Sequence, residues 1–206
     1  MGQNFMNHDP LLGIRESFKQ LADFSDDHLD TLTASLKTVT YRRNEYFSTP
    51  DKPSTMLAFV SRGLFKQYVI DLNGNEVIRE FCGDNMFMST YAAITLNIFQ
   101  PIYVQAIENS IIAVIPRVTF LEIIENEQKW KDVLQELTEL DCLHLYKREF
   151  SLLLDDAKTR YLNFLKDYHL FADRIKLKDV ASYLGISPET LSRLRSLPLK
   201  KQENNN

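Results

Sequence analysis

The stretch that most constrains the fold lies near the end of the chain, between Ile175 and Arg195. Its first half carries apolar residues at the i, i+3, i+4 and i+7 spacing of one helix face. These residues are Leu177, Val180, Ala181 and Leu184. Gly185 follows them, and a glycine readily adopts the left-handed conformation that ends a helix at a tight turn. The pattern therefore predicts a short helix that stops at Gly185.

The residues after this turn have the features of a second helix. Ser187 can cap its N-terminus, and Pro188 suits the first turn, where a missing N–H leaves no hydrogen bond unmade. Leu191 and Leu194 then lie on one face, while the small Ala181 lets the two helices approach closely. Two short helices joined in this way are typical of a helix-turn-helix, whose second helix enters the DNA major groove. The alternative interpretation is an ordinary helical hairpin in a protein core.

Charge is distributed unevenly along the 206 residues. The net charge of −4 taken alone disfavours a nucleic-acid partner. However, residues 157–206 hold ten Lys and Arg against five Asp and Glu, whereas residues 1–156 hold 14 against 23. The predicted helix-turn-helix thus lies in a basic segment, and an acidic segment precedes it. This distribution is the one expected of a DNA-binding module attached to an acidic partner domain.

Ahead of the basic segment the sequence predicts helices and then strands. Residues 11–40 have a helical pattern, and Ser25 is placed to cap a helix. From Tyr41 to about Ile115 the pattern changes to short β-prone runs separated by turn residues. Such a pattern is typical of an antiparallel β-sandwich, roll or barrel.

Two hairpins are predicted within this β-rich region. Residues 71–75 contain Asn-Gly, the strongest short hairpin signal, between the β-prone runs 64–70 and 76–81. Residues 103–107 and 111–115 are expected to form a second antiparallel pair.

Helices are predicted again after the strands. Residues 118–127 have the pattern of a short helix, and a long helix is expected from Lys129 to about Leu154. Apolar residues recur along the long helix, and such a stripe needs a partner, so we expect the helix to form a homodimer seam. The alternative is that it packs only on its own β-domain.

The sequence contains no catalytic constellation. Its histidines are His8, His28, His144 and His169, so none lies in the β-rich region to serve a metal-dependent enzyme of the cupin type. No P-loop, dinucleotide-binding glycine motif or Gly-x-Ser-x-Gly occurs, and Cys82 and Cys142 match no metal or redox spacing. There is also no signal-peptide pattern or apolar run of membrane-spanning length. We therefore expect a cytoplasmic protein that is not an enzyme and holds no metal.

The order of these elements resembles the Crp/Fnr family of bacterial transcription regulators over nearly the whole chain. Its most specific parts are residues 59–66 with 71–76, and residues 177–195. The resemblance implies an α+β fold with an N-terminal antiparallel β-roll of the cyclic-nucleotide-binding, jelly-roll type, a long dimerisation helix and a C-terminal winged helix-turn-helix. The implied domains are a sensor domain at 1–128, the dimerisation helix at 129–156 and a DNA-binding domain at 157–206.

The resemblance also implies partners, namely double-stranded DNA, a second copy of the chain and RNA polymerase. Glu189 and Arg193 match positions that family members use on base edges, and Pro188 stands where many members have an arginine. Lys176 and Lys178 are expected to face phosphates. Further DNA contacts are expected from Ser187, Pro188 and Thr190.

The ligand-binding part departs from family members that bind cyclic AMP. Ser89 stands near the position of their glutamate, and Gln100 near the position of their arginine. A buried cyclic phosphate would lose its main charge-assisted contact without a guanidinium, so we do not expect tight binding of cyclic AMP. The N-terminal cysteines of the iron–sulfur oxygen sensors are also missing. A less anionic, unidentified effector could instead be held by Met86, Phe87, Met88, Ser89, Gln100 and Tyr103, although the apolar members of this set fit a plain core equally well.

A second class of function remains open. The same elements suit a signalling protein that binds a cyclic nucleotide or another small ligand and whose helical C-terminus does not bind DNA. The uneven distribution of charge favours the transcription regulator.

Overall fold

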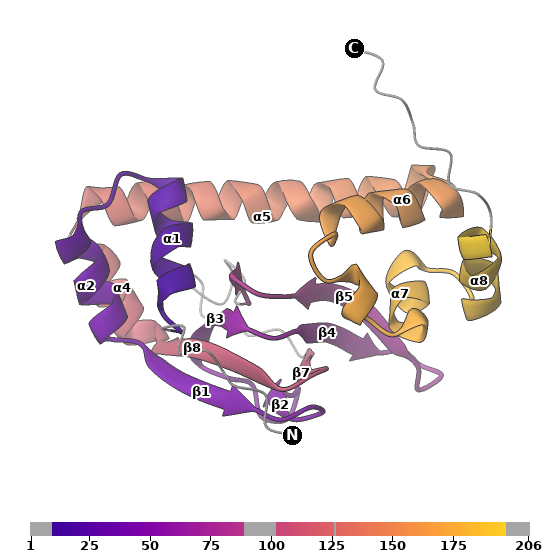
Figure 1. The fold of residues 1–206 in the computed structure, drawn as a ribbon, viewed down its shortest axis with the longest axis horizontal. Helices are drawn as coiled ribbons and strands as arrows, with labels where there is room; N and C mark the ends of the chain where they lie inside the picture. The colour runs from indigo at the N-terminus through magenta and orange to yellow at the C-terminus, as the bar shows by residue number, and fades with distance from the viewer. Residues whose placement is uncertain (1–9, 89–101, 126, 197–206) are drawn as a thin grey trace, which may run out of the picture. The chain divides into compact units, whose positions relative to one another are not determined.

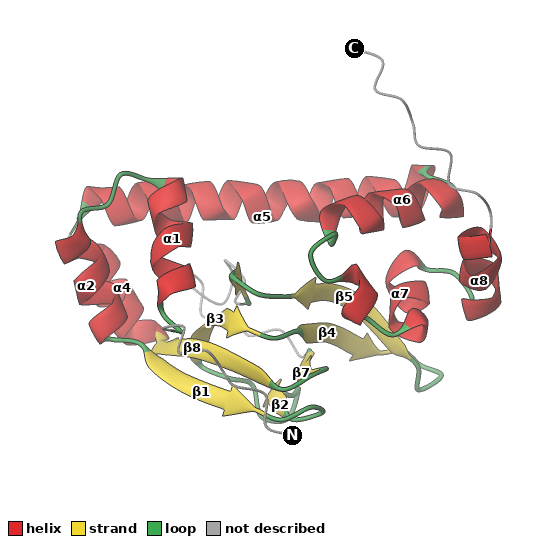
Figure 2. Ribbon diagram, viewed as in Figure 1, coloured by secondary structure: helices red, strands yellow, loops and turns green. Residues whose placement is uncertain are grey.

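The computed structural model describes residues 10–88, 102–125 and 127–196, and every structural statement below refers to these residues. They form helices and two antiparallel sheets (Figures 1 and 2). The chain divides into two compact units. Unit 1 contains the residues up to Val69 together with Arg79–Leu145, and unit 2 contains Ile70–Ile78 together with the residues from Tyr146 onward.

Unit 1 begins with two helices, α1 (Leu12–Leu21) and α2 (Asp26–Ala34). Ser25 caps α2 as predicted, since its hydroxyl accepts a hydrogen bond from a backbone N–H in the first turn. The helical region ends before residue 40, because Lys37–Tyr41 forms the first strand, β1. This correction has a local reason, since β1 is rich in threonine, valine and tyrosine, which favour strands.

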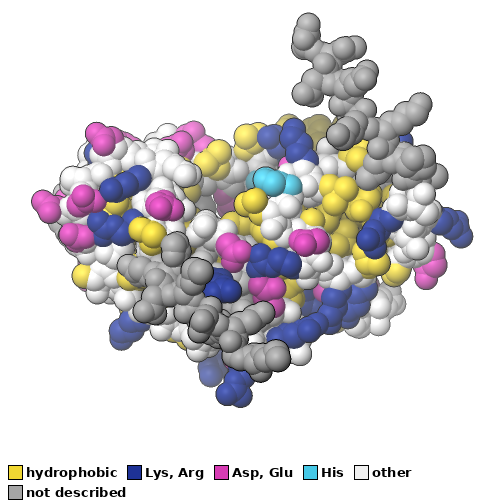
Figure 3. All heavy atoms as spheres, in the orientation of Figure 1, with side chains coloured by type: hydrophobic (Ala, Val, Ile, Leu, Met, Phe, Trp, Pro, Cys, Tyr) yellow, Lys and Arg dark blue, Asp and Glu magenta, His cyan; other side chains and the backbone are white. Residues whose placement is uncertain are grey.

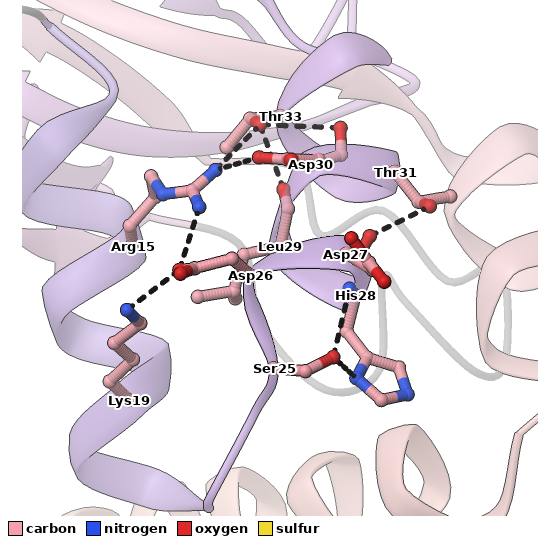
Figure 4. A network of polar contacts seen from close by, with 10 residues as sticks. All are labelled: Arg15, Lys19, Ser25, Asp26, Asp27, His28, Leu29, Asp30, Thr31 and Thr33. Carbon is pink, nitrogen blue, oxygen red and sulfur yellow. Dashed lines mark hydrogen bonds and ion pairs between the residues drawn. The ribbon is translucent and has the colours of Figure 1, made fainter.

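Ion pairs join α1 to α2 on the surface of unit 1 (Figure 4). The Arg15 guanidinium lies 3.2 Å from the Asp26 carboxylate and 2.6 Å from that of Asp30. The Lys19 ammonium is 2.8 Å from Asp26. Lys19 and Arg15 together lower the pKa of Asp26. Both aspartates are exposed, so these pairs orient the helices but contribute little to stability.

Two four-stranded sheets form the β-roll within the described residues. The first sheet has the order β1–β8–β3–β6, with β8 at Ser110–Pro116, β3 at Met56–Arg62 and β6 at Met86–Phe87. The second has the order β2–β7–β4–β5, with bounds Tyr46–Ser48, Tyr103–Ala106, Phe65–Ile70 and Glu76–Cys82. The tips of β4 and β5 belong to unit 2.

One of the two predicted hairpins is confirmed. Strands β4 and β5 are neighbours and flank residues 71–75, where Gly74 has a φ of +81° that suits a glycine. The other prediction was wrong, because β7 and β8 lie in different sheets. Strand β7 pairs with β2 and β4, whereas β8 pairs with β1 and β3. A short turn between two β-prone runs indicates a change of direction, but it does not fix which strands become partners.

Two apolar cores stabilise unit 1. One lies between the sheets and includes Val60, Phe65 and Val104. The other lies where the first sheet meets α1, α2, α4 (Arg117–Glu125) and the start of α5 (Gln128–Leu154). Its largest side chains include Phe18, Phe59 and Trp130.

Unit 2 contains the tip of the β4–β5 hairpin, the end of α5 and a helical bundle. The helices are α6 (Ala157–Asp167), the 3₁₀ helix η1 (Ala172–Arg174), α7 (Leu177–Leu184) and α8 (Pro188–Ser196). Asp156 caps α6 by accepting a hydrogen bond of 2.7 Å from the Thr159 N–H. Aromatic rings from α6 and α7 pack in its core, including Phe164, Tyr168 and Tyr183.

Candidate nucleic-acid interface

Helices α7 and α8 form the predicted helix-turn-helix. Ala181, Leu184 and Leu191 are buried at their contact, with exposed fractions of 1%, 2% and 0%. Gly185 ends α7 in the left-handed conformation, with a φ of +64°. The Ile186 N–H then bonds to the Ala181 carbonyl at 3.0 Å, which satisfies a carbonyl left open at the helix end. The turn therefore fixes the direction in which α8 leaves α7.

Leu177 departs from the predicted buried face, because it is 46% exposed. It is the first residue of α7, and helical side chains tilt toward the N-terminus. Its side chain therefore points beyond the end of the helix and away from the packed turns. The apolar spacing is correct for Val180, Ala181 and Leu184, which are all buried.

The start of α8 is built as the sequence predicts. The Ser187 hydroxyl accepts a hydrogen bond of 3.2 Å from the Thr190 N–H, and Pro188 is the first helical residue. Glu189 follows, where the N–H groups of the first turn favour a negative charge. A backbone hydrogen bond and the Ser187 side chain, with the Arg193 charge as a smaller cause, lower the pKa of Glu189. Glu189 is therefore fully ionised near neutral pH.

The face of α8 opposite Leu191 is exposed. It carries Glu189 and, one turn later, Arg193. Arg193 makes no ion pair within 4 Å with any residue of the described ranges, so its guanidinium is available to an external acceptor. Arg195, in the same last turn, is also exposed. The sequence pattern did not single out Arg195, which lies two residues after Arg193 and therefore on a different side of the helix, one turn beyond Leu191.

The two predicted phosphate contacts lie at the start of α7. Lys176 is the residue that precedes the helix, Lys178 lies in its first turn, and both are exposed. Lys and Arg side chains are also visible on the surface near α8 (Figure 3). Unit 2 therefore presents basic side chains from both helices of the helix-turn-helix.

A hairpin tip packs against α7 within unit 2. The Ser182 hydroxyl accepts a hydrogen bond of 3.0 Å from the Ile78 N–H and donates one of 2.7 Å to the Glu76 carbonyl. Arg148, from the end of α5, donates to the carbonyls of Ile78 and Tyr183 at 3.0 and 3.3 Å. The edge of β5 is thus held by one side chain of α5 and one of α7. The sequence carries no signal for these contacts, because their partners are backbone groups far away in the chain.

The predicted effector residues are only partly brought together. Phe87 packs edge-on against Phe18 and Phe59, with ring centroids 5.3 and 5.2 Å apart, and Met88 is buried beside it. Phe87 and Met88 both line one cavity of unit 1. Tyr103 instead stacks on Tyr68, with ring centroids 4.9 Å apart, in the second sheet.

Among the described members of this set, Met86 and Tyr103 do not line that cavity. Met86 is half-buried, and its sulfur accepts a hydrogen bond from the Gly83 N–H at 3.4 Å. Ser89 and Gln100 lie outside the described residues. Asp84, next to Gly83, has a structural role, because its carboxylate accepts a hydrogen bond of 2.5 Å from the Gly63 N–H.

The described part of the chain has neither a candidate membrane span nor a candidate metal site. None of its helices is both long and apolar enough to cross a membrane. No three His, Cys, Asp or Glu side chains within those ranges converge in a way that could hold a metal ion.

A β-roll followed by a long helix and a helix-turn-helix defines the fold of the Crp/Fnr regulators, and this chain has that fold. No protein-family model matches the sequence, and no curated protein matches it. Among solved structures, FixK2 from Bradyrhizobium japonicum is similar, with a TM-score of 0.68, 20% identity, and coverage of 78% of this chain and 83% of that one.

Two further structures show the same relationship. The c-di-GMP responsive global regulator CLP of Xanthomonas campestris gives a TM-score of 0.66 at 13% identity, over 82% of this chain and 89% of that one. The catabolite activator protein of Thermus thermophilus gives 0.55 at 17% identity, over 91% and 85%. The resemblance predicted from the sequence is therefore confirmed at the level of the fold.

Proposed function

We propose that this chain is a transcription regulator of the Crp/Fnr type that binds double-stranded DNA through α8. The observation that carries the proposal is the exposed face of α8. Glu189 and Arg193 lie one turn apart on this face, while Leu191 is buried on the opposite face. A guanidinium can pair bidentately with guanine, and a carboxylate can accept from cytosine N4. Arg193 and Glu189 are therefore assigned to base edges.

The surrounding residues position the helix on the DNA backbone. Lys176 and Lys178 are exposed cations at the start of α7 and are assigned to phosphates. Ser187 and Thr190, at the exposed N-terminus of α8, are assigned to the same strand because a helix N-terminus attracts phosphate. Pro188 lacks an N–H, so it contributes surface contact and no donated hydrogen bond.

The proposed regulator is a homodimer that associates through α5. The start of this helix packs on its own unit, since Trp130 and Val133 are buried. The later part of α5 has an exposed apolar stripe, whose side chains follow one another at alternating spacings of three and four residues. They are Leu143, Tyr146, Phe150 and Leu153, with exposed fractions of 47%, 60%, 43% and 73%. This spacing is that of a coiled-coil seam, and a two-fold dimer would place two α8 helices about 34 Å apart on a pseudo-palindromic site.

The proposal includes a sensor role for the β-roll, with an effector other than cyclic AMP. It also includes a cytoplasmic location, a productive contact with RNA polymerase and no catalytic activity, all by analogy with regulators of this fold. The domain limits 1–128, 129–156 and 157–206 remain our prediction for how these roles are divided.

The test is a selection of binding sites from random duplexes, with the wild type, Arg193→Ala and the control Lys131→Ala. Lys131 is an exposed cation of α5 in unit 1, so its removal changes net charge equally without altering α8. The wild type and the control should enrich the same two-fold motif. Arg193→Ala should lose information at one position in each half-site and bind about 5- to 150-fold more weakly per half-site, since a bidentate base contact contributes about 1–3 kcal/mol.

The result also separates the two classes of function. If the wild type enriches no motif and binds random duplexes no better than single strands, the chain is a ligand-binding signalling protein and our proposal is wrong. If Arg193→Ala retains the full motif, DNA binding stands but the assigned readout does not.

A further inference from the structure

Unit 1 contains a cavity of about 120 Å³ between the first sheet and the helices that cover it. Its walls come from α1, α2, α4, α5 and the strands β3, β5, β6 and β8. They are largely apolar and include Ile14, Phe18, Phe59, Phe87, Phe120 and Leu137. Every residue of this lining belongs to unit 1, so the cavity does not depend on how the two units are arranged.

The size of this space limits what it can hold. Protein interiors are close-packed, and voids much larger than one water molecule are few. An engineered apolar cavity of about 150 Å³ in another protein stays dry and binds benzene. A space of about 120 Å³ therefore suits one aromatic ring or a short branched chain, and it is too small for a nucleotide.

One part of the lining is polar, and its charged side chains are acidic. Glu80 of β5 and Asp141 of α5 contribute carboxylates, and Thr138 contributes a hydroxyl. The lining, as far as the structure describes it, contains no Lys, Arg or His. Thr138 donates its hydroxyl proton to the Leu134 carbonyl at 2.6 Å, so its oxygen faces a ligand mainly as an acceptor. The polar part therefore offers acceptors to a ligand.

The same negative charge affects the thiol of Cys82, which follows Glu80 by two residues on β5. Burial is the main reason why the pKa of Cys82 lies above its usual range, and the Glu80 carboxylate raises it further, with a smaller effect from Asp141. The Asp141 carboxylate would repel an anionic ligand in this space and attract a cation. This electrostatic preference is opposite to that of a site for a cyclic phosphate.

We propose that the cavity binds a small hydrophobic amine, with its apolar body among the aromatic side chains and its ammonium group toward Asp141. The role of this ligand as the effector of a DNA-binding regulator rests on the proposed function, whereas its binding to the cavity does not. The same site also gives Phe87 and Met88 the ligand-facing role predicted from the sequence.

The test is calorimetric titration of the full chain without DNA, using three probes of similar size. They are benzylamine, toluene and benzoate, which carry a positive, neutral and negative charge at neutral pH. We expect benzylamine to bind most tightly, toluene more weakly, and benzoate not measurably. Asp141→Asn should weaken benzylamine at least fivefold and leave toluene unchanged. The control Glu136→Gln removes an exposed carboxylate of the same helix and should change neither.

A second pair of variants tests the location. Ala113 and Leu137 line the cavity, so Ala113→Val or Leu137→Phe should fill part of it and weaken both benzylamine and toluene. Two variants from different walls are used so that one folding failure does not decide the result. The proposal would be overturned if the wild type bound benzoate as tightly as benzylamine. It would also be overturned if the wild type bound neither benzylamine nor toluene. Since DNA is absent, failure of the proposed DNA binding would leave these outcomes intact.

Discussion

The Arg148 guanidinium lies over the Tyr183 ring, with its central carbon 3.9 Å from the ring centroid. The same guanidinium donates to the backbone carbonyl of Tyr183 and to that of Ile78. One half-buried side chain at the end of α5 therefore holds both α7 and the edge of β5 within unit 2. A planar guanidinium can stack and donate at the same time, which a lysine ammonium cannot do.

Arg148→Lys should accordingly be nearly as harmful as Arg148→Ala. We expect either change to lower the free energy of unfolding of unit 2 by about 1–3 kcal/mol, because both remove the stacked guanidinium and alanine also leaves two carbonyls without this donor. Urea unfolding followed by near-ultraviolet circular dichroism would measure this. The matched control is Glu149→Ala, which alters the exposed neighbour and should stay within about 0.5 kcal/mol of the wild type. A fully stable Arg148→Lys variant would show that the stacking is dispensable.

Ser182→Ala tests the contact between α7 and β5 separately. The substitution leaves the Ile78 N–H without its acceptor and the Glu76 carbonyl without its donor. We expect faster hydrogen exchange at the Ile78 amide and a loss of about 1–3 kcal/mol in stability. Amide exchange read by NMR is the measurement, with Ser192→Ala on the exposed face of α8 as the control. Unchanged protection of the Ile78 amide would contradict this role of Ser182.

Gly63 should tolerate alanine less well than Gly185 or Gly74, although all three have positive φ. At Gly185 (φ +64°) a Cβ would meet only Leu152 at 3.6 Å, so Gly185→Ala should cost about 1–2 kcal/mol for the left-handed backbone alone. At Gly63 (φ +119°) a Cβ would fall 2.2 Å from the Ser110 hydroxyl oxygen and 2.6 Å from the Ser110 Cα, so Gly63→Ala should be the most destabilising.

Gly74 completes this series. A Cβ there would meet nothing within 4 Å, so Gly74→Ala should resemble Gly185→Ala and stay far below Gly63→Ala. Thermal unfolding of the three variants would give the order. Gly185→Asn should recover part of the loss, because asparagine tolerates the left-handed conformation. Equal losses at Gly63 and Gly74 would contradict the close approach to Ser110.

Stability should fall in acid through the cap of α6. A hydrogen bond from the Thr159 backbone lowers the pKa of Asp156 in the folded state. The lowered value means that this stabilisation is fully present above the ordinary aspartate pKa and is lost as the pH falls through the folded-state pKa. Thermal unfolding between pH 6 and pH 3 should show this loss, and Asp156→Asn, which caps without titrating, should reduce the slope. An identical slope in Asp156→Asn would exclude Asp156 as a contributor.

The proposed dimer can be tested at the exposed part of α5. Phe150→Glu places a charge at the centre of the four-residue apolar stripe, and Phe150 is 43% exposed in the single chain. We expect the wild type to sediment as a dimer at micromolar concentration and Phe150→Glu as a monomer with unchanged helix content. Lys147→Glu, a charge reversal at an exposed position in the same part of the helix, serves as the comparison. A wild type that stays monomeric even with DNA present would rule out this seam.

Much of unit 2 could be predicted from the sequence because its signals are local. Gly185 ends α7, Ser187 caps α8 and Pro188 occupies its first turn, as expected. Each of these effects operates within about four residues, so neighbouring letters are enough to predict it. The hairpin at residues 71–75 was predictable for the same reason.

Only the tertiary structure decided the remaining features, because they depend on residues far apart in the chain. Ser182 and Glu76 are 106 positions apart, and a serine in a helix gives no indication that its partner is a strand carbonyl. The separation of β7 and β8 into different sheets depends on β1 and β3, which pair with the two edges of β8. The cavity of unit 1 likewise exists only where four helices and strands of both sheets meet without filling the space between them. Local conformational preferences can be read from adjacent residues, but strand partners and packing voids are decided by the contacts that the whole chain makes at once.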